Sequence, residues 1–288
     1  MLDKIIIFKD KARDIFYKEF DFECIANGYR FTEGPIWDNN KNCLYFTDFQ
    51  DDMIYCFNEN NGVSVYRSNS NRAIGLAMDN CGNIISTESS KHRIAMITDS
   101  DSTAIAEYYK GKRFNSPNDV VVSKNGTIWF TDPYSEAMGV ESEIGINGIY
   151  CIKPNGDVKL VYGGIKRPNG IALSNDETVL YVNDTNLQQI FVFDINENCD
   201  FSEPKVLATL NTSYGAGAVD GMKIDYSGNI WVTGPAGIWV LEPTGEPLAI
   251  LKCPEYVGNF CFGGENMKDL YITASSSVYK VPIKGECN

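Results

Sequence analysis

The chain has 288 residues, of which 43% are hydrophobic, and a formal net charge of −13 at neutral pH. A protein this acidic repels phosphate backbones, so we do not expect a nucleic-acid partner. The single histidine, His92, excludes sites that need two or more histidines. No G-x-S-x-G sequence is present to supply the exposed nucleophile of a serine hydrolase.

The N-terminal region has a short apolar run at residues 5–8, followed at once by charged residues. The run is too short for a signal-peptide core or a membrane span, so we expect a cytoplasmic protein with no membrane partner. A short helix is plausible within residues 9–20, and we treat residues 1–20 as an extension of one domain that covers residues 1–288. The nine cysteines include no C-x-x-C pair, and we expect buried thiols rather than disulfides.

A strand-like segment then recurs six times along the chain. The segments begin at Glu33, Ile74, Asn118, Asn169, Asp220 and Gly258. Successive starts lie about 40 to 50 residues apart, which is the spacing of propeller blades. A turn rich in Asn, Asp and Gly follows each segment and leads into a second strand, at residues 43–47, 84–87, 127–131, 179–183, 230–233 and 270–273. The pattern predicts an all-β fold, a six-bladed β-propeller with four-stranded blades.

The last repeat ends soon after its third strand, at residues 277–283, and so lacks an outer strand. Residues 21–27, which precede the first inner strand, could supply it. This closure would leave no open edge between the first and last blades. The sequence therefore predicts that the N-terminal strand closes the ring, and that a chain beginning at Glu33 would not fold.

The first residues of the six segments form a column, and four of them carry a side-chain oxygen. These four are Glu33, Asn118, Asn169 and Asp220. Equivalent positions of a propeller meet near its axis, and converging carboxylate and amide oxygens suit a hard cation such as Ca²⁺. Asn and Asp also open strands as ordinary turn residues. Glu33 is a poor turn residue, which favours the metal interpretation.

A second column lies at the ends of the second strands, with the pairs Thr47-Asp48, Thr87-Glu88, Thr131-Asp132 and Asn183-Asp184. We expect its acids to bond local backbone amides. Asp132 is followed by Tyr134 and an insertion at residues 134–147, which could overhang the channel and contact substrate. Asp119 could hydrogen-bond a metal-bound water or a neighbouring amide, or it could open its strand and face away from the axis. His92 is expected in a solvated turn.

Six stretches in sequence order carry a resemblance to a known family: residues 31–37, 116–122, 130–134, 167–172, 180–184 and 219–225. With these motifs the chain resembles the senescence-marker-protein, gluconolactonase and luciferin-regenerating-enzyme family, which includes regucalcin and bacterial sugar lactonases. The residues of these motifs are most similar to those of the bacterial gluconolactonase branch. The resemblance implies a six-bladed propeller with one divalent cation at the channel mouth.

The family's metal-binding Glu, Asn and Asp fall on Glu33, Asn169 and Asp220. The Asn of the family's Asn-Asp motif falls on Asn118, and in the family this residue contacts the metal, the metal-bound water or the substrate. Two positions depart from the family pattern in the substrate region. Ser116 stands where the regucalcin branch has an arginine, and Thr87-Glu88-Ser89 stands where many gluconolactonases have Cys-Glu-His.

The resemblance implies a metal-dependent lactonase that opens a small-molecule lactone, with Ca²⁺ as the expected cation and Mg²⁺, Mn²⁺ or Zn²⁺ as alternatives. Asp220 and Asn118 are the predicted catalytic residues, Asp220 as the base. The predicted substrate contacts are Asn118, Asp119, Asp132 and Tyr134. Two other functions remain open: hydrolysis of organophosphates or other esters on the same metal site, and a non-catalytic, ligand-binding propeller.

Overall fold

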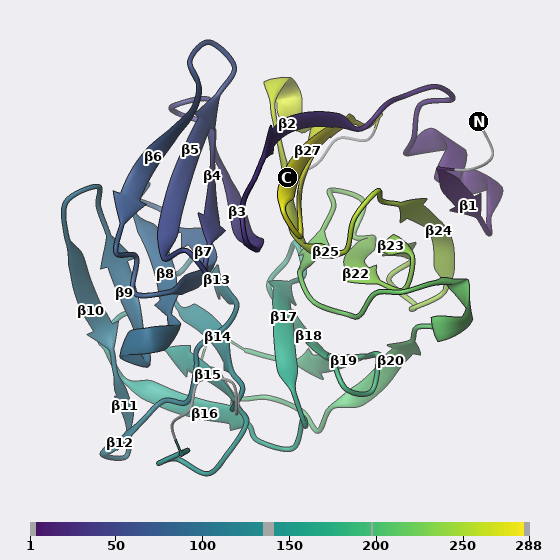
Figure 1. Ribbon diagram of the computed structural model, residues 1–288. Coiled ribbons are helices and arrows are strands. Elements are labelled where there is room, and N and C mark those ends of the chain that lie inside the picture. The colour runs from purple at the N-terminus through teal and green to yellow at the C-terminus, as the bar shows by residue number, and fades with distance from the viewer. Residues whose placement is uncertain (1–3, 135–140, 197, 285–288) are drawn as a thin grey trace.

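The computed structural model describes residues 4–134, 141–196 and 198–284. Six antiparallel sheets surround a common axis, with strands β3, β7, β13, β17 and β25 nearest the middle (Figure 1). This arrangement confirms the predicted six-bladed propeller. None of the helices in the described ranges is long and apolar enough to cross a membrane.

From the axis outward, the first blade contains β3 (Thr32–Asp38), β4 (Cys43–Asp48), β5 (Met53–Asn58) and β6 (Gly62–Ser68), and the second contains β7 (Ala73–Met78), β8 (Ile84–Glu88), β9 (Arg93–Ile97) and β10 (Ser102–Ala106). The third contains, in the same order, β13 (Val120–Val122), β14 (Ile128–Asp132), β15 (Gly148–Ile152) and β16 (Val158–Tyr162). A small hairpin of β11 (Tyr108–Tyr109) and β12 (Lys112–Arg113) lies between the second and third blades in the chain.

The fourth blade contains β17 (Pro168–Leu173), β18 (Val179–Asp184), β19 (Gln189–Asp194) and β20 (Lys205–Thr209). The fifth contains β21 (Met222–Ile224), β22 (Ile230–Gly234), β23 (Gly237–Leu241), β24 (Pro247–Lys252) and β1 (Ile5–Ile7). The sixth contains β25 (Val257–Gly263), β26 (Asp269–Ala274), β27 (Ser277–Pro282) and β2 (Glu23–Asn27). The short 3₁₀ helices are η1 (Asp10–Asp14), η2 (Ser89–Lys91), η4 (Thr212–Tyr214) and η5 (Glu265–Met267).

The ring closes as the sequence predicts. Strand β2 pairs antiparallel with β27, with Glu23 opposite Lys280. On the other side of the closure, Trp37 of the first blade stacks on Tyr271 of the sixth, with ring centroids 5.1 Å apart and an interplanar angle of 10°. The sixth blade is therefore completed by the N-terminal part of the chain, and the seam is packed by large side chains that bury much apolar surface.

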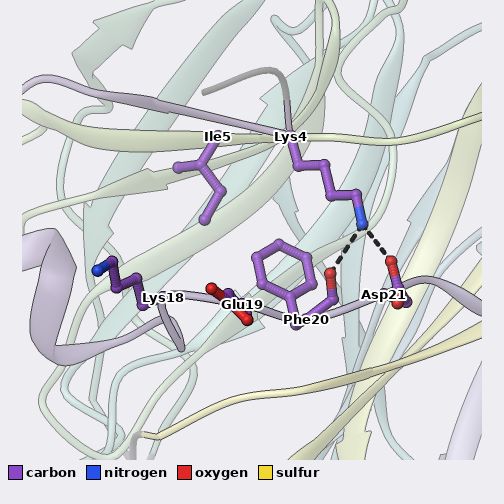
Figure 2. Close-up of a pocket in the computed structure, with 6 residues that line it drawn as sticks. All are labelled: Lys4, Ile5, Lys18, Glu19, Phe20 and Asp21. Carbon is purple, nitrogen blue, oxygen red and sulfur yellow. Dashed lines mark hydrogen bonds and ion pairs between the residues drawn. The ribbon is translucent and has the colours of Figure 1, made fainter. Parts of the chain in front are cut away.

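Strand β1 is a feature that the sequence did not indicate. It adds to the outer edge of the fifth blade, where Ile5 pairs with Leu251 of β24. Helix η1 follows within the range expected for a helix. Phe16 then packs on Trp231, with ring centroids 5.7 Å apart. Lys4 donates a hydrogen bond to the carbonyl of Phe20 at 2.8 Å and pairs with Asp21 (Figure 2). The described part of the N-terminal extension is thus attached to the fifth and sixth blades.

The cysteines of the described ranges, eight in number, are all free thiols, so no disulfide supports this part of the fold. Four of them are buried, as expected, whereas Cys24 and Cys81 are exposed. The expectation of buried thiols is therefore wrong for these two, because each lies where the strand or turn faces solvent.

Neighbouring blades are bonded to each other at the start of their inner strands. In four of the six blades, a side chain near the end of the second strand donates to the carbonyl of the column residue in the next blade: Thr47 to Ile74 (3.0 Å), Thr87 to Asn118 (2.8 Å), Thr131 to Asn169 (2.7 Å) and Asn183 to Asp220 (2.6 Å). The approach is close, since a Cβ on Gly170 would lie 2.0 Å from the carbonyl oxygen of Asp220. These bonds hold the column in register and explain the threonines of the second column.

Candidate active site

The column residues lie at the beginning of the inner strands. Glu33 and Asn169 lie within β3 and β17 and are 4% and 7% exposed. Asn118 and Asp220 lie two positions before the regular parts of β13 and β21 and are half-buried. Glu33 and Asn169 therefore form the buried part of the cluster, and Asn118 and Asp220 are the members that reach solvent.

Three carboxylates, two of them buried, interact with one another in this cluster. Burial raises the pKa of Glu33 to about 7, with a further contribution from the charge of Asp119. Burial also raises the pKa of Asp220 well above its ordinary value, and the charges of Glu33 and Asp119 add to the effect. The pKa of Asp119 is raised by burial as well. The cluster therefore resists carrying three negative charges without a positive partner.

A lysine and an amide oppose this accumulation of charge from inside the channel. The Nζ of Lys223 donates to Oδ1 of Asn259 at 3.2 Å and to the carbonyl of Met222 at 3.1 Å. Its charge lowers the pKa of both Glu33 and Asp119, and the Asn259 amide bonds Glu33. Lys223 also lines a cavity of about 610 Å³ that extends along the later residues of the inner strands. It therefore lies between the acidic cluster and this cavity.

The oxygen donors of the cluster fit a divalent cation. The amide of Asn169 donates to Oγ1 of Thr185 at 3.1 Å and bonds Asp220, whereas its oxygen Oδ1 is buried with no hydrogen-bond partner in the structure. A buried amide oxygen without a donor is costly unless a cation or a water occupies the space beside it. Gly258, the sixth column residue, leaves room for the set, because a Cβ there would lie 2.5 Å from Oε1 of Glu33.

No group of three or more His, Cys, Asp or Glu side chains in the described ranges is arranged to hold a metal ion. A cation at the column would therefore depend on the amides of Asn118 and Asn169 as well as on the two carboxylates. Mixed carboxylate and amide oxygens are a ligand set that Ca²⁺ accepts.

Most acids of the second column bond backbone amides, as expected. The two carboxylate oxygens of Asp132 accept from the N–H groups of Asn115 and Ser116, both at 2.8 Å, and Asp48 and Asp184 bond the equivalent segments of their blades. Glu88 is different: it is fully buried and pairs with Arg93 at 2.6 Å. These acids therefore shape the loops that lead into the column.

The other predicted site residues are spread over the same face. Asp119 belongs to the cluster and accepts from the N–H of Val120 at 2.9 Å. Asp132 is fully buried, and burial raises its pKa to about 8. Tyr134 is 37% exposed, and its N–H donates to Asn147 at 2.7 Å. Residues 135–140 of the insertion lie outside the described residues. His92 is half-buried, and its Nδ1 contacts the carbonyl of Asn115.

Four residues near the cluster were not singled out from the sequence: Lys223, Asn259, Arg167 and Tyr256. A signal for two of them was present in the repeat. The residue directly after the column residue is glycine in four repeats but Asp119 and Asn259 in the other two. The residue three positions after the column residue is apolar in every repeat except one, where it is Lys223. A polar residue that breaks an otherwise uniform position of a repeat is a useful indication of a site.

A propeller with carboxylates and amides gathered at the start of its inner strands defines the class of this protein. A family model described as the SMP-30/Gluconolactonase/LRE-like region matches residues 31–276, and the chain belongs to this family. It is 31% identical over 310 residues to a gluconolactonase from Zymomonas mobilis, with 98% of this chain and 87% of that protein covered.

Two solved structures show the same fold. A gluconolactonase from Xanthomonas campestris superposes with a TM-score of 0.90 at 24% identity, covering 98% of this chain and 95% of that one. A calcium-binding protein, regucalcin, from Agrobacterium tumefaciens superposes with a TM-score of 0.79 at 18% identity, covering 93% of this chain and 96% of that one.

Proposed function

We propose that this protein is a divalent-cation-dependent lactonase that opens a sugar lactone. The observation that carries the proposal is the oxygen cluster, in which the charge of Glu33 raises the pKa of Asp220 and Asn169 presents an oxygen with no hydrogen-bond partner. Nothing in the pairing of strands requires such an arrangement. Membership of the family and the similarity to the Zymomonas mobilis gluconolactonase support the choice of a lactone as substrate.

Glu33, Asn118, Asn169 and Asp220 would hold the cation, with Ca²⁺ as our first choice and Mg²⁺, Mn²⁺ or Zn²⁺ as alternatives. When bound, such a cation polarises a carbonyl and acidifies water. In the hydrolysis, a water oxygen attacks the lactone carbonyl carbon, the ring C–O bond breaks, and the ring oxygen leaves as a hydroxyl group. The product is an open-chain hydroxy acid.

Asp220 is the residue that we assign as the base for the attacking water. It is the more exposed of the two column carboxylates, so it can contact a water that enters from solvent. A carboxylate positioned within hydrogen-bond reach of a water can act as its general base. The proton that Asp220 takes from water can then be delivered to the departing ring oxygen.

Asn118 is assigned to orient the lactone carbonyl. Its side chain is half-buried at the mouth and makes no hydrogen bond to the described residues, so its amide is available to a ligand. A fixed N–H donor beside a carbonyl oxygen stabilises the negative charge that develops there. Asp119 adds negative charge beneath the site. Asp132 acts through Asn115 and Ser116, whose backbone N–H groups it holds, and the partly exposed Tyr134 is assigned as a substrate contact.

The test measures hydrolysis of glucono-1,5-lactone by the release of protons, and compares its rate with that of spontaneous hydrolysis. The protein is stripped with EDTA, and each divalent cation is then restored. We expect turnover that needs the cation and that is lost in Glu33→Gln and Asp220→Asn, while the exposed Glu203→Gln, a matched loss of one carboxylate, keeps wild-type activity. Tight cation binding without turnover of any lactone would contradict the proposal and would favour a phosphotriester substrate or a binding role.

A further inference from the structure

The positions two residues before the column form a ring at the mouth of the site. The second-column acids show that the loops carrying these positions are equivalent in three blades, because Asp48 accepts from the N–H groups of Arg30 and Phe31, Asp132 from those of Asn115 and Ser116, and Asp184 from that of Lys166. Counting back from the column gives the full ring: Phe31, Arg72, Ser116, Arg167, Ala218 and Tyr256. These residues precede the oxygen cluster by one step of the strand pleat.

The net charge of this ring is opposite in sign to that of the whole chain. The protein has 38 acidic and 25 basic residues, but the ring contains two arginines and no acid. Acids next to the ring are held by other groups: Asp132 by backbone N–H groups, Asp51 by Arg30, and Glu255 by Ser276 and Tyr279. A substrate that approaches the cluster therefore first meets neutral and positive groups.

Neither ring arginine forms an ion pair with the described residues, but Arg72 is half-buried, whereas Arg167 is exposed and is the one whose charge acts on the cluster. Its side chain is exposed, and no carboxylate among the described residues forms an ion pair or hydrogen bond with it. It is nevertheless close enough to the cluster for its charge to lower the pKa of Asp220 and of Tyr256. Its backbone is fixed, since its carbonyl accepts from the N–H of Thr185 at 3.1 Å and it directly precedes Pro168 in β17. A guanidinium that no described carboxylate pairs with is thus held beside the mouth.

Tyr256 provides an aromatic wall near Arg167. It is 38% exposed, and its ring centroid lies 6.2 Å from that of Phe31. Burial raises the pKa of Tyr256, and the charges of Asp220 and Glu33 raise it further, which places its hydroxyl within the field of the cluster. An aromatic ring beside a cation offers an apolar face for the C–H groups of a sugar ring and a hydroxyl for its oxygens.

We propose that Arg167 binds an anionic substituent of the substrate, so that the preferred lactones carry a carboxylate or phosphate group remote from the reacting carbonyl. The inference rests on the lactonase function proposed above and names the substrate class of the same site. A guanidinium binds either anion with two parallel N–H···O bonds, which fixes orientation as well as affinity. Arg167 would hold the substituent while the carbonyl lies at the oxygen cluster.

The test compares three lactones with the cation-loaded protein: neutral glucono-1,5-lactone, glucaro-1,4-lactone with a free carboxylate, and 6-phosphoglucono-1,5-lactone. We expect wild type to have a higher kcat/KM for at least one acidic lactone than for the neutral one. Arg167→Gln should lower kcat/KM for that lactone about 10- to 100-fold, mainly through KM, because hydrogen bonds to charged groups are lost. The two acidic lactones distinguish a carboxylate site from a phosphate site.

The matched control is Arg30→Gln, which removes the same charge from a neighbouring position of the first blade, where Arg30 pairs with Asp51 at 3.1 Å. It should leave the ratio of acidic to neutral turnover unchanged. If Arg167→Gln lowers turnover of the neutral lactone by the same factor, or changes neither, Arg167 does not select an anion and the inference is wrong.

A binding measurement separates this inference from the lactonase function. Glucarate, the open-chain diacid, is titrated calorimetrically into wild type and Arg167→Gln in the presence of the cation. About tenfold weaker binding by the variant supports the anion site even if no lactone is hydrolysed. Equal affinities, or no binding by either protein, overturn it whatever the lactonase assay shows.

Discussion

Replacing Glu33 by glutamine should stabilise the metal-free protein, although it should destroy the function. The pKa of Glu33 is raised from 4.5 to about 7, so at high pH the folded protein holds a carboxylate that would be more easily ionised in the unfolded chain. The difference corresponds to about 3 kcal/mol of lost stability. Glutamine is nearly the same size and cannot ionise, so it removes this cost.

The sign of the effect sets its pH dependence. A carboxyl group whose pKa is higher in the folded state favours folding at low pH, and this contribution is lost as the pH rises. Glu33→Gln and wild type should therefore have similar stability below pH 4.5. The variant should gain between pH 4.5 and about 7, and the gain should stay constant above that. About 3 kcal/mol corresponds to a rise of about 5 to 10 °C in Tm for a protein of this size.

The assay is thermal unfolding in EDTA at several pH values between 4.5 and 8, with exposed Glu203→Gln as the control that should follow wild type. Saturating Ca²⁺ should then stabilise wild type by about 3 kcal/mol at a hundredfold excess over Kd, and Glu33→Gln by less. The reasoning is refuted if wild type is the more stable protein in EDTA at pH 8, or if the difference between the two does not vary with pH.

Three further predictions follow from the same contacts. Lys223→Met should lower Tm in EDTA, because the acids lose their internal cation, and should tighten Ca²⁺ binding on the order of tenfold in calorimetry, since a competing positive charge is gone; weaker binding would contradict this role. Gly258→Ala should weaken Ca²⁺ binding and lactone turnover with little effect on circular dichroism, because its Cβ would lie 2.5 Å from Oε1 of Glu33; an unchanged Kd would mean that the carboxylate is not held there. A chain that begins at residue 33 should be unfolded by circular dichroism, whereas one that begins at residue 9 should fold with a lower Tm, because β2 closes the ring and β1 only widens the fifth blade; equal behaviour of the two truncations would contradict the closure argument.

The repeat made the fold predictable from sequence. Each unit combines an inner strand, an Asn- or Gly-rich turn and a β-branched second strand, and only an arrangement around an axis uses all six in the same way. Closure by residues 21–27 followed from counting strands, and β2 occupies Glu23–Asn27. Strand β1 could not be found in this way, because three isoleucines have no periodicity and their pairing depends on the free edge of β24, which is remote in the sequence.

The candidate site was predictable in its column but not in its electrostatics. Glu33, Asn169 and Asp220 interact as the alignment of repeats predicts, since equivalent positions of a propeller meet. The position of Lys223 beneath them depends on Asn259, one blade further on, whose amide holds the lysine's Nζ. Such a contact joins side chains at different heights of different strands, and no pattern within a single repeat encodes it.

The bonds between blades explain how the fold tolerates this unfavourable cluster. Thr131 and Asn183 fix the carbonyls of Asn169 and Asp220 through hydrogen bonds of 2.7 Å and 2.6 Å. The column backbone is therefore held by groups that do not titrate. Substitutions of the column carboxylates can then alter the charge without releasing the strands. A site built in this way keeps its oxygen donors close together, so the proposed cation would have little ordering left to impose on binding.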